Sequence, residues 1–162
     1  MAVALRSGSE VLEIYNRHVE TVYRVCFSFM KTRSETEDMV QETFLRLLTC
    51  GKRFENERHE KAWLIVTASN ACKDSLKKWW RREESLEDYS GASCQDIPVD
   101  NPVLEAIFSL PNDYKTVVYL HYYEGYTTAE IARHLRCPDA TVRSRLSRAR
   151  KQLQELLGGE NA

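Results

Sequence analysis

Glycine and proline are scarce in this chain, with 6 and 4 residues respectively among 162. A protein built from strands and tight turns needs more of both, because they supply the backbone conformations of turns. Hydrophobic residues make up 43% of the sequence and charged residues 29%, which is typical of globular rather than disordered chains. We therefore expect a globular protein that is mostly helical.

The sequence also lacks long apolar runs and paired metal ligands. No stretch approaches the length of a membrane span, and the N-terminus has no basic region followed by an apolar core. The 5 cysteines and 4 histidines include no CxxC or HxxxH pair. We expect a cytoplasmic protein with reduced thiols, no direct membrane insertion, no metal and no cofactor.

Charge is distributed unevenly, although the net charge is only −1. Residues 73–82 hold five basic residues and one acidic residue, and residues 127–157 hold seven and three, so each segment has a local charge of +4. Between them, residues 83–101 carry six acids and no base. A nucleic-acid-binding protein with a small net charge needs this kind of local concentration of positive charge.

Apolar residues recur every three or four positions in several segments, which is typical of amphipathic helices. We expect helices over 9–30, from a capping box at Ser34 and Glu37 to Gly51, and from about Ala62 to Trp80, with a loop at 52–60. The acidic stretch 83–101 is poor in apolar residues and is expected to be a flexible linker. Further helices are expected over 102–109, 111–123, from Thr127 or Thr128 to Leu135, and 140–157.

The fold class expected from this pattern is all-α, with two small helical domains joined by a flexible acidic linker. Their expected bounds are 9–82 and 102–157, with the linker at 83–101.

The last two helices have the features of a helix-turn-helix. A buried side is expected at Ala129, Ile131, Ala132 and Leu135 in the first helix, and at Val142, Leu146, Ala149 and Leu153 in the second. Pro138 marks the turn between them. The opposite face of the second helix carries Arg143, Ser144, Ser147 and Arg148, residue types that contact base edges and phosphates in the major groove. The alternative is an ordinary terminal helix with a solvated arginine face.

Segments in both halves of the sequence resemble a known family. The last third of the chain, LPNDYKTVVYLHYYEGY followed by TTAEIARHLRCPDATVRSRLSRARKQLQELL, closely resembles region 4 of the extracytoplasmic-function (ECF, group 4) sigma factors of the sigma-70 family. The upstream half agrees: EDMVQETFLRLL is similar to region 2.2, and KAWLIVTASNACKDSLKKWWRR is similar to regions 2.3 and 2.4. The resemblance covers about residues 11–82 and 101–157, in the family's order.

The resemblance implies a bacterial sigma factor that binds core RNA polymerase and directs promoter-specific transcription initiation. Region 4 would read the −35 element and region 2 would melt the −10 element. The implied −35 contacts are Thr141, Arg143, Ser144, Arg145, Ser147, Arg148, Arg150 and Lys151. The implied −10 contacts are Phe54, Asn70, Lys73, Lys77, Lys78, Arg81 and Arg82.

The resemblance also implies partners. Asp38, Gln41, Glu42 and Leu45 form an outward stripe that matches the family's surface for the coiled coil of the polymerase largest subunit, and the polymerase flap would be a second contact. An anti-sigma factor is common in the family, but no stripe in this sequence identifies its docking surface. Solubilising helix charges are the alternative for the acidic stripe, and packing of the loop is the alternative for Phe54.

Two pairs of residues depart from the family pattern. Trp79 and Trp80 stand where basic residues are usual, so they are expected to stack on bases, pack on the polymerase or cover the core, with packing favoured for one of them. Arg136 and Ala140 stand at turn positions that are often glycine.

Two other classes of protein remain as alternatives. A phosphorylation-controlled regulator would need alternating strands and helices before the helix-turn-helix, and the first half is helical instead. An enzyme would need a phosphate loop, a nucleophile elbow or paired ligands, and the sequence has none of these. We therefore expect no catalytic activity of the chain itself.

Overall fold

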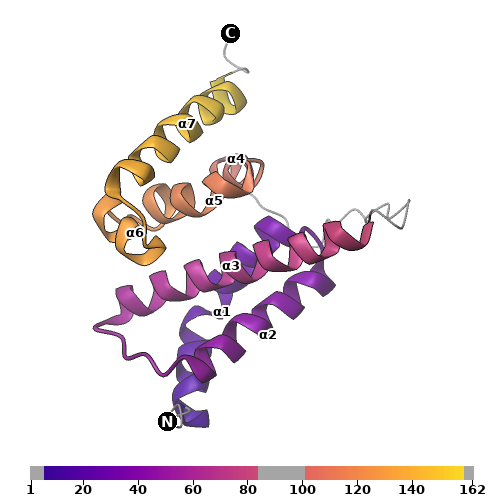
Figure 1. The fold of residues 1–162 in the computed structure, drawn as a ribbon, viewed down its shortest axis with the longest axis vertical. Helices are drawn as coiled ribbons and strands as arrows, with labels where there is room; N and C mark the ends of the chain where they lie inside the picture. Colours follow the sequence, from indigo (N-terminus) through magenta and orange to yellow (C-terminus); the bar gives the residue numbers. More distant parts are fainter. Residues whose placement is uncertain (1–5, 84–100, 159–162) are drawn as a thin grey trace. The chain divides into compact units, whose positions relative to one another are not determined.

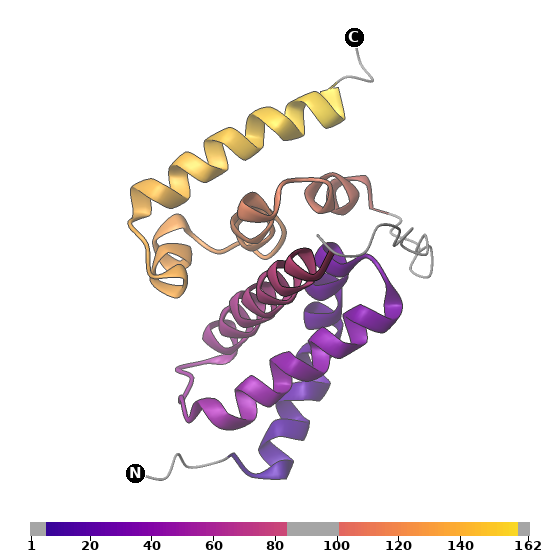
Figure 2. The same ribbon diagram turned by 45° about the vertical axis from the view of Figure 1, so that its right-hand side comes forward.

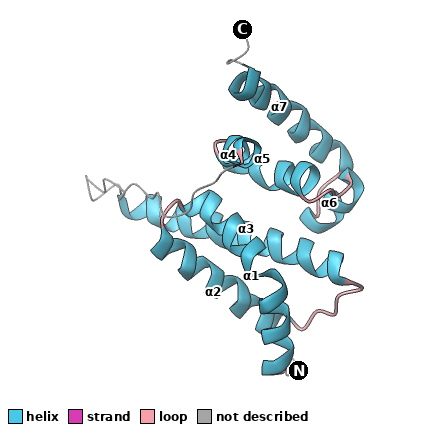
Figure 3. Cartoon of the chain, turned by 180° about the vertical axis from the view of Figure 1, so that it is seen from behind, coloured by secondary structure: helices cyan, strands magenta, loops and turns pink. Residues whose placement is uncertain are grey.

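The computed structural model describes residues 6–83 and 101–158, with the side chains of Arg82 and Glu83 left out of the description. In these ranges the chain consists of helices and their connections, without strands (Figure 3). Helices α1–α3 form one compact unit and helices α4–α7 form a second. The expected all-α class with two helical units is confirmed. The expected acidic linker lies outside the described residues.

The first unit is a bundle of three long helices, α1 (Gly8–Met30), α2 (Arg33–Cys50) and α3 (Glu57–Glu83), each packed against the other two (Figures 1 and 2). Its centre is formed by side chains with no more than 1% exposure, including Val22, Leu47, Leu64 and Ile65. Burying one such aliphatic side chain stabilises a fold by roughly 1.5–3 kcal/mol, so the bundle holds α3 firmly on its buried side.

The connection between α1 and α2 differs from the expectation. Lys31 ends α1 with a φ of 67°, and Thr32 then caps α2 by accepting a hydrogen bond from the Glu35 backbone N–H at 3.3 Å. The capping box expected at Ser34 and Glu37 is therefore wrong. Once the chain has reversed at Lys31, Thr32 is already the first residue with extended backbone, and Ser34 falls inside the helix.

The loop between α2 and α3 is shorter than expected. Gly51 ends α2 with a φ of 63°, as its position after the last apolar residue predicts. Helix α3 begins at Glu57 rather than near Ala62, because the Asn56 side chain accepts a hydrogen bond from the His59 backbone N–H at 2.8 Å. Glu57 and Glu60 in the first turn favour the same start, since acidic groups stabilise the positive end of a helix.

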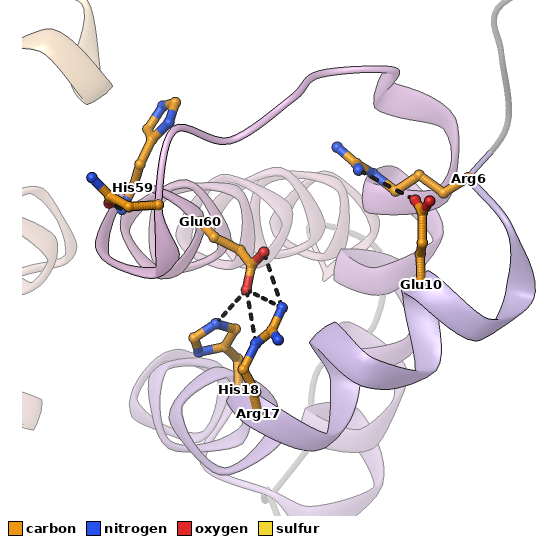
Figure 4. A network of polar contacts seen from close by, with 7 residues as sticks. Arg6, Glu10, Arg17, His18, His59 and Glu60 are labelled. Carbon is orange, nitrogen blue, oxygen red and sulfur yellow. Dashed lines mark hydrogen bonds and ion pairs between the residues drawn. The ribbon is translucent and has the colours of Figure 1, made fainter.

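A polar network that the sequence did not predict ties α3 to α1 (Figure 4). The Glu60 carboxylate lies 2.7 Å from His18 Nε2 and accepts hydrogen bonds from Arg17 Nη2 at 3.0 and 3.3 Å. His18 is 2% exposed and Glu60 is 7% exposed, so the pairing satisfies groups that water barely reaches. His59, the preceding residue on α3, points to the other side, toward the loop.

The second unit comprises α4 (Pro102–Phe108), α5 (Asn112–Val118), the π-helical turn η1 (Tyr119–Tyr123), α6 (Thr128–Leu135) and α7 (Asp139–Gly158). Asn101 caps α4 by accepting from the backbone N–H groups of Val103 and Leu104 at 3.0 and 3.4 Å. The expected single helix 111–123 is an α-helix that widens into η1. There the Glu124 backbone N–H donates to the Tyr119 carbonyl, and Gly125 turns the chain with a φ of 80°.

The Glu60 network is expected to contribute to the stability of the first unit. We expect Glu60→Ala to lower its free energy of unfolding by about 1–3 kcal/mol, because the buried His18 ring loses its partner. Urea unfolding followed by tryptophan fluorescence reports this unit, since Trp63, Trp79 and Trp80, the 3 tryptophans of the chain, all lie on α3. The control is Glu13→Ala, an exposed acid inside α1 of the same unit, which should change stability by less than about 0.5 kcal/mol. Equal effects of the two substitutions would contradict a specific role for the network.

Candidate nucleic-acid interface

Helix α6 begins with a capping box, and of the two expected caps, Thr127 and Thr128, the structure has Thr127. The Thr127 hydroxyl accepts from the Glu130 backbone N–H at 3.1 Å, and the Glu130 carboxylate accepts from the Thr127 backbone N–H at 3.0 Å. Ile131 and Ala132 are buried as expected, and Leu135 is half-buried. Ala129 is exposed, so its expected place on the buried side is wrong. It lies three residues before Ala132 but at the very start of a short helix, where α7 does not cover it.

The turn between α6 and α7 places an arginine in a left-handed conformation. Arg136 has a φ of 56° and ends α6, and the Cys137 backbone N–H donates to the Ala132 carbonyl at 3.1 Å. This is the glycine-type helix end that the sequence position indicated, adopted here by a residue with a side chain. The turn therefore forms without glycine, at some cost in backbone strain.

Helix α7 separates a buried face from an exposed one. Val142, Leu146 and Ala149 have at most 1% exposure and pack against the rest of the unit, as their spacing predicts. The opposite face consists of exposed side chains, namely Arg143, Ser144, Ser147, Arg148, Arg150 and Lys151. Thr141 and Arg145 are half-buried, which places them at the edges of this face. The α7 face therefore offers arginine and serine side chains to a major groove.

An ion pair at the start of α7 holds one of these arginines. Arg143 Nε lies 2.9 Å from Asp139 Oδ2, one helical turn earlier. The Arg143 side chain is nevertheless 66% exposed, so it stays accessible to a ligand. The pair restricts the rotamers of Arg143, which reduces the entropy lost when a phosphate or base edge is bound.

A second basic surface runs along α3 in the first unit. Asn70 is exposed, and its side chain has no hydrogen-bond partner among the described residues. Lys77, Lys78 and Arg81 are exposed and Lys73 is half-buried, whereas the Arg82 side chain lies outside the described part. The one acid within this stretch, Asp74, lies 3.5 Å from Arg46 of α2, which offsets its charge. The face is therefore suited to a polyanion.

The loop before α3 is anchored through an aromatic cluster. The half-buried ring of Phe54 lies 5.6 Å from the ring of Trp63 and 5.5 Å from that of His59, centroid to centroid. The guanidinium carbon of Arg6 sits 5.0 Å from the Phe54 centroid. These contacts favour a role for Phe54 in holding the loop. Sequence reasoning missed Arg6 and Trp63, because nothing local in the sequence indicates their contact with residue 54.

The expected stripe on α2 is at the surface. Asp38 and Gln41 are exposed, and Leu45 is 56% exposed. Glu42 accepts a hydrogen bond from Arg46 Nε at 3.1 Å, so part of its charge is already paired. The structure thus brings together an apolar residue and acidic groups on one accessible face, the arrangement that fits a basic helical partner.

The second unit also has an apolar groove that sequence reasoning missed. It has a volume of about 500 Å³ and is lined by side chains of α4, α5, η1 and the end of α7, among them Val103, Ile107, Tyr122, Leu153 and Leu157. Val103, Tyr122 and Leu157 are each more than 40% exposed. The signal in the sequence was the run of leucines that continues on α7 beyond the residues needed to pack α6.

Two helical units, one with a helix-turn-helix and both with exposed basic faces, define a DNA-binding protein of the helix-turn-helix class. Comparison with known proteins gives the family: residues 14–82 match Sigma-70 region 2, and residues 100–153 match Sigma-70, region 4. The chain is 31% identical to the ECF RNA polymerase sigma factor SigL of Mycobacterium tuberculosis, with 88% of each chain covered. The protein belongs to the family of ECF RNA polymerase sigma factors.

Two further relatives agree. The chain is 28% identical to the ECF RNA polymerase sigma factor SigW of Bacillus subtilis, covering 92% of this chain and 88% of the relative. The solved sigma factor RpoE from Bartonella quintana, crystallised with the anti-sigma factor NepR, is similar with a TM-score of 0.66 and 26% identity, covering 93% of this chain and 95% of that one. Among the described residues, no helix is both long and apolar enough to cross a bilayer.

The strained turn before α7 gives a prediction. Arg136→Gly should stabilise the second unit by roughly 0.5–1 kcal/mol, because glycine adopts a positive φ without a Cβ clash. Slower hydrogen exchange of the α6 amides would show this. Arg133→Gly is the control: it lies inside α6 with ordinary helical backbone, and it should destabilise the unit by up to about 1 kcal/mol. A loss of stability in Arg136→Gly would mean that the arginine side chain makes contacts worth more than the strain.

Proposed function

We propose that this protein binds core RNA polymerase and directs initiation at a specific set of promoters, with the second unit reading the −35 element and the first unit melting the −10 element. The observation that carries the proposal is the exposed α7 face of arginines and serines, on a helix whose opposite side is buried at Val142, Leu146 and Ala149. A helix held this rigidly presents its side chains to base edges in a defined register.

The contacts proposed at the −35 element are those of α7. Arg143, Ser144, Ser147 and Arg148 lie on the face directed away from the core and would enter the groove. Thr141 and Arg145 lie at its edges, and Arg150 and Lys151 lie about one turn further along the helix, where phosphates would be in reach. The start of α7 is also the positive end of its helix dipole, which favours a nearby phosphate.

The first unit is proposed to trap an unpaired base of the −10 element. Asn70 has an amide that donates and accepts at a base edge, and it lies at the surface of α3. Phe54 fixes the loop that would form the wall of the pocket. Lys73, Lys77, Lys78, Arg81 and Arg82 would bind the backbone phosphates on the same side. Separating a base from its stack costs a few kcal/mol, which such contacts offset.

Two polymerase contacts are proposed. The α2 stripe of Asp38, Gln41, Glu42 and Leu45 would bind the coiled coil of the largest subunit, and the apolar groove of the second unit would receive the flap. A groove of this kind suits an apolar segment of a partner, because docking removes exposed Val103, Tyr122 and Leu157 from water. An anti-sigma factor is proposed as a further partner, because the similar RpoE of Bartonella quintana was crystallised with the anti-sigma factor NepR.

The proposal assigns RNA synthesis to the polymerase and no catalytic activity to this chain. It also places the protein in the cytoplasm, where RNA polymerase acts. Each +4 basic segment gives only modest affinity for DNA, so specific binding needs both units held together on the polymerase. The chain alone should therefore bind promoter DNA weakly.

The test is transcription in vitro with bacterial core polymerase and a library of promoter sequences. The expected result is initiation from a subset of promoters that share −35 and −10 sequences, and no initiation by core alone. If the chain neither binds core nor supports initiation on any promoter, the proposal is wrong. Nucleotide turnover by the purified chain would contradict the assignment of catalysis to the polymerase.

A single substitution tests the assignment of the α7 face. Arg148→Ala should reduce discrimination at particular −35 bases by about 1–3 kcal/mol if the guanidinium makes a bidentate base contact. The comparison is Lys151→Ala, which should weaken all promoters alike and lower the salt dependence of binding, as expected of a phosphate contact. Affinities for a set of −35 variants distinguish the two. Uniform weakening by Arg148→Ala would reassign Arg148 to the DNA backbone.

A further inference from the structure

Trp80 is the most exposed of the large hydrophobic side chains in the described residues, at 67%. Its neighbour Trp79 is half-buried, so one indole packs, as favoured from the sequence, and the other does not. Cys72 is the last fully buried residue described on α3, and beyond it the helix leaves the core of the bundle. Packing of the first unit therefore does not account for a tryptophan at position 80.

The position of Trp80 on α3 indicates what the indole faces. Asn70, Lys77 and Trp80 are separated by seven and three residues, so they share one side of the helix, within about 80° of each other. Arg81 is exposed about 20° around the helix from Asn70, whereas Lys78 is exposed on the flank away from Trp80. The indole thus stands one helical turn from the ammonium-bearing Lys77, on the side that carries Asn70.

Charge and shape together favour a nucleic acid as the occupant. Exposed Lys77, Lys78 and Arg81 attract phosphates and would repel a basic protein surface. An aromatic side chain between basic residues is the combination that binds an unstacked base while the cations bind the backbone. An acidic protein segment would form ion pairs with the basic side chains, but it would offer no planar ring to stack on the face of the indole.

We infer that Trp80 is a stacking surface for a nucleobase of promoter DNA, on the α3 side that Asn70 occupies. The inference rests on the proposed function, because it takes promoter DNA as the ligand. Ten residues of helix at about 1.5 Å each place Trp80 about 15 Å from Asn70 along α3. Bases in duplex DNA are about 3.4 Å apart and those of an unstacked strand are further apart, so the stacked base is at most about four steps from the base held at Asn70.

The experiment uses the holoenzyme of this chain with core RNA polymerase, on a promoter that the wild-type protein recognises. Trp80→Ala and Trp80→Phe are compared for promoter affinity over a range of salt concentrations. We expect Trp80→Ala to lose about fivefold to about one-hundredfold in affinity, the range found for removal of one base-stacking aromatic residue. Trp80→Phe should retain most of the affinity, since its ring still stacks.

Salt dependence distinguishes stacking from a charge effect. Removing an uncharged indole should leave the slope of log affinity against log salt unchanged, whereas Lys77→Ala should lower that slope by about one. The fluorescent base 2-aminopurine is placed singly at successive positions, up to about six steps on either side of the base held at Asn70. At one of these positions its fluorescence should be higher in the Trp80→Ala holoenzyme than in the wild type. That position is the stacked base.

Leu12→Ala is the control for a generic loss of exposed apolar surface, because Leu12 is 59% exposed on α1 in the same unit. It should leave promoter affinity unchanged. Unchanged affinity in Trp80→Ala, or a loss of affinity for core polymerase instead of DNA, would overturn the inference about Trp80 and leave the proposed function standing. A wild-type holoenzyme that binds no promoter would overturn both.

Discussion

Helix α3 must serve as the wall of a hydrophobic core and as an exposed basic surface at the same time, and the first unit is organised around that requirement. Leu64, Ile65 and Ala68 are buried to 0% exposure by α1 and α2. Asn70 and Lys77, further along the helix, remain at the surface. Because a helix is stiff, whatever fixes its buried half also fixes the direction of its exposed half. The packing of the bundle thus sets the geometry of the proposed −10 contacts.

The start of α3 has its own constraints, and they are polar and aromatic. Glu60 ties the first turn to His18 and Arg17 of α1, while Phe54 packs its loop on Trp63 under the guanidinium of Arg6. The two sets of contacts act on the loop before α3 and on its first two turns. A surface that traps an unstacked base has to be organised beforehand, because an ordering cost added to the cost of unstacking would weaken binding.

In the second unit, a smaller buried core likewise fixes the direction of an exposed helix face. Val142, Leu146 and Ala149 anchor α7, and the capping box of Thr127 and Glu130 fixes the helix that precedes it. The end of α7 continues past that core and leaves an apolar groove with α4 and η1. One helix therefore carries an arginine-rich face near its start and an apolar surface near its end. This division is consistent with a module that binds DNA and a protein partner together.

The sequence alone determined the features that depend on residues close together along the chain. Helical periodicity, the stop at Gly51, a threonine cap at Thr127 or Thr128 and the polar face of α7 all follow from patterns within a few positions, where backbone sterics and local hydrogen bonds decide. Only the tertiary structure decided the features that join distant residues. Glu60 contacts His18 from 42 positions away, Val103 of α4 and Leu157 of α7 line one groove, and Trp79 is half-buried while Trp80 stays exposed. Such outcomes depend on how helices pack against one another, and side-chain periodicity along one helix does not specify its partner.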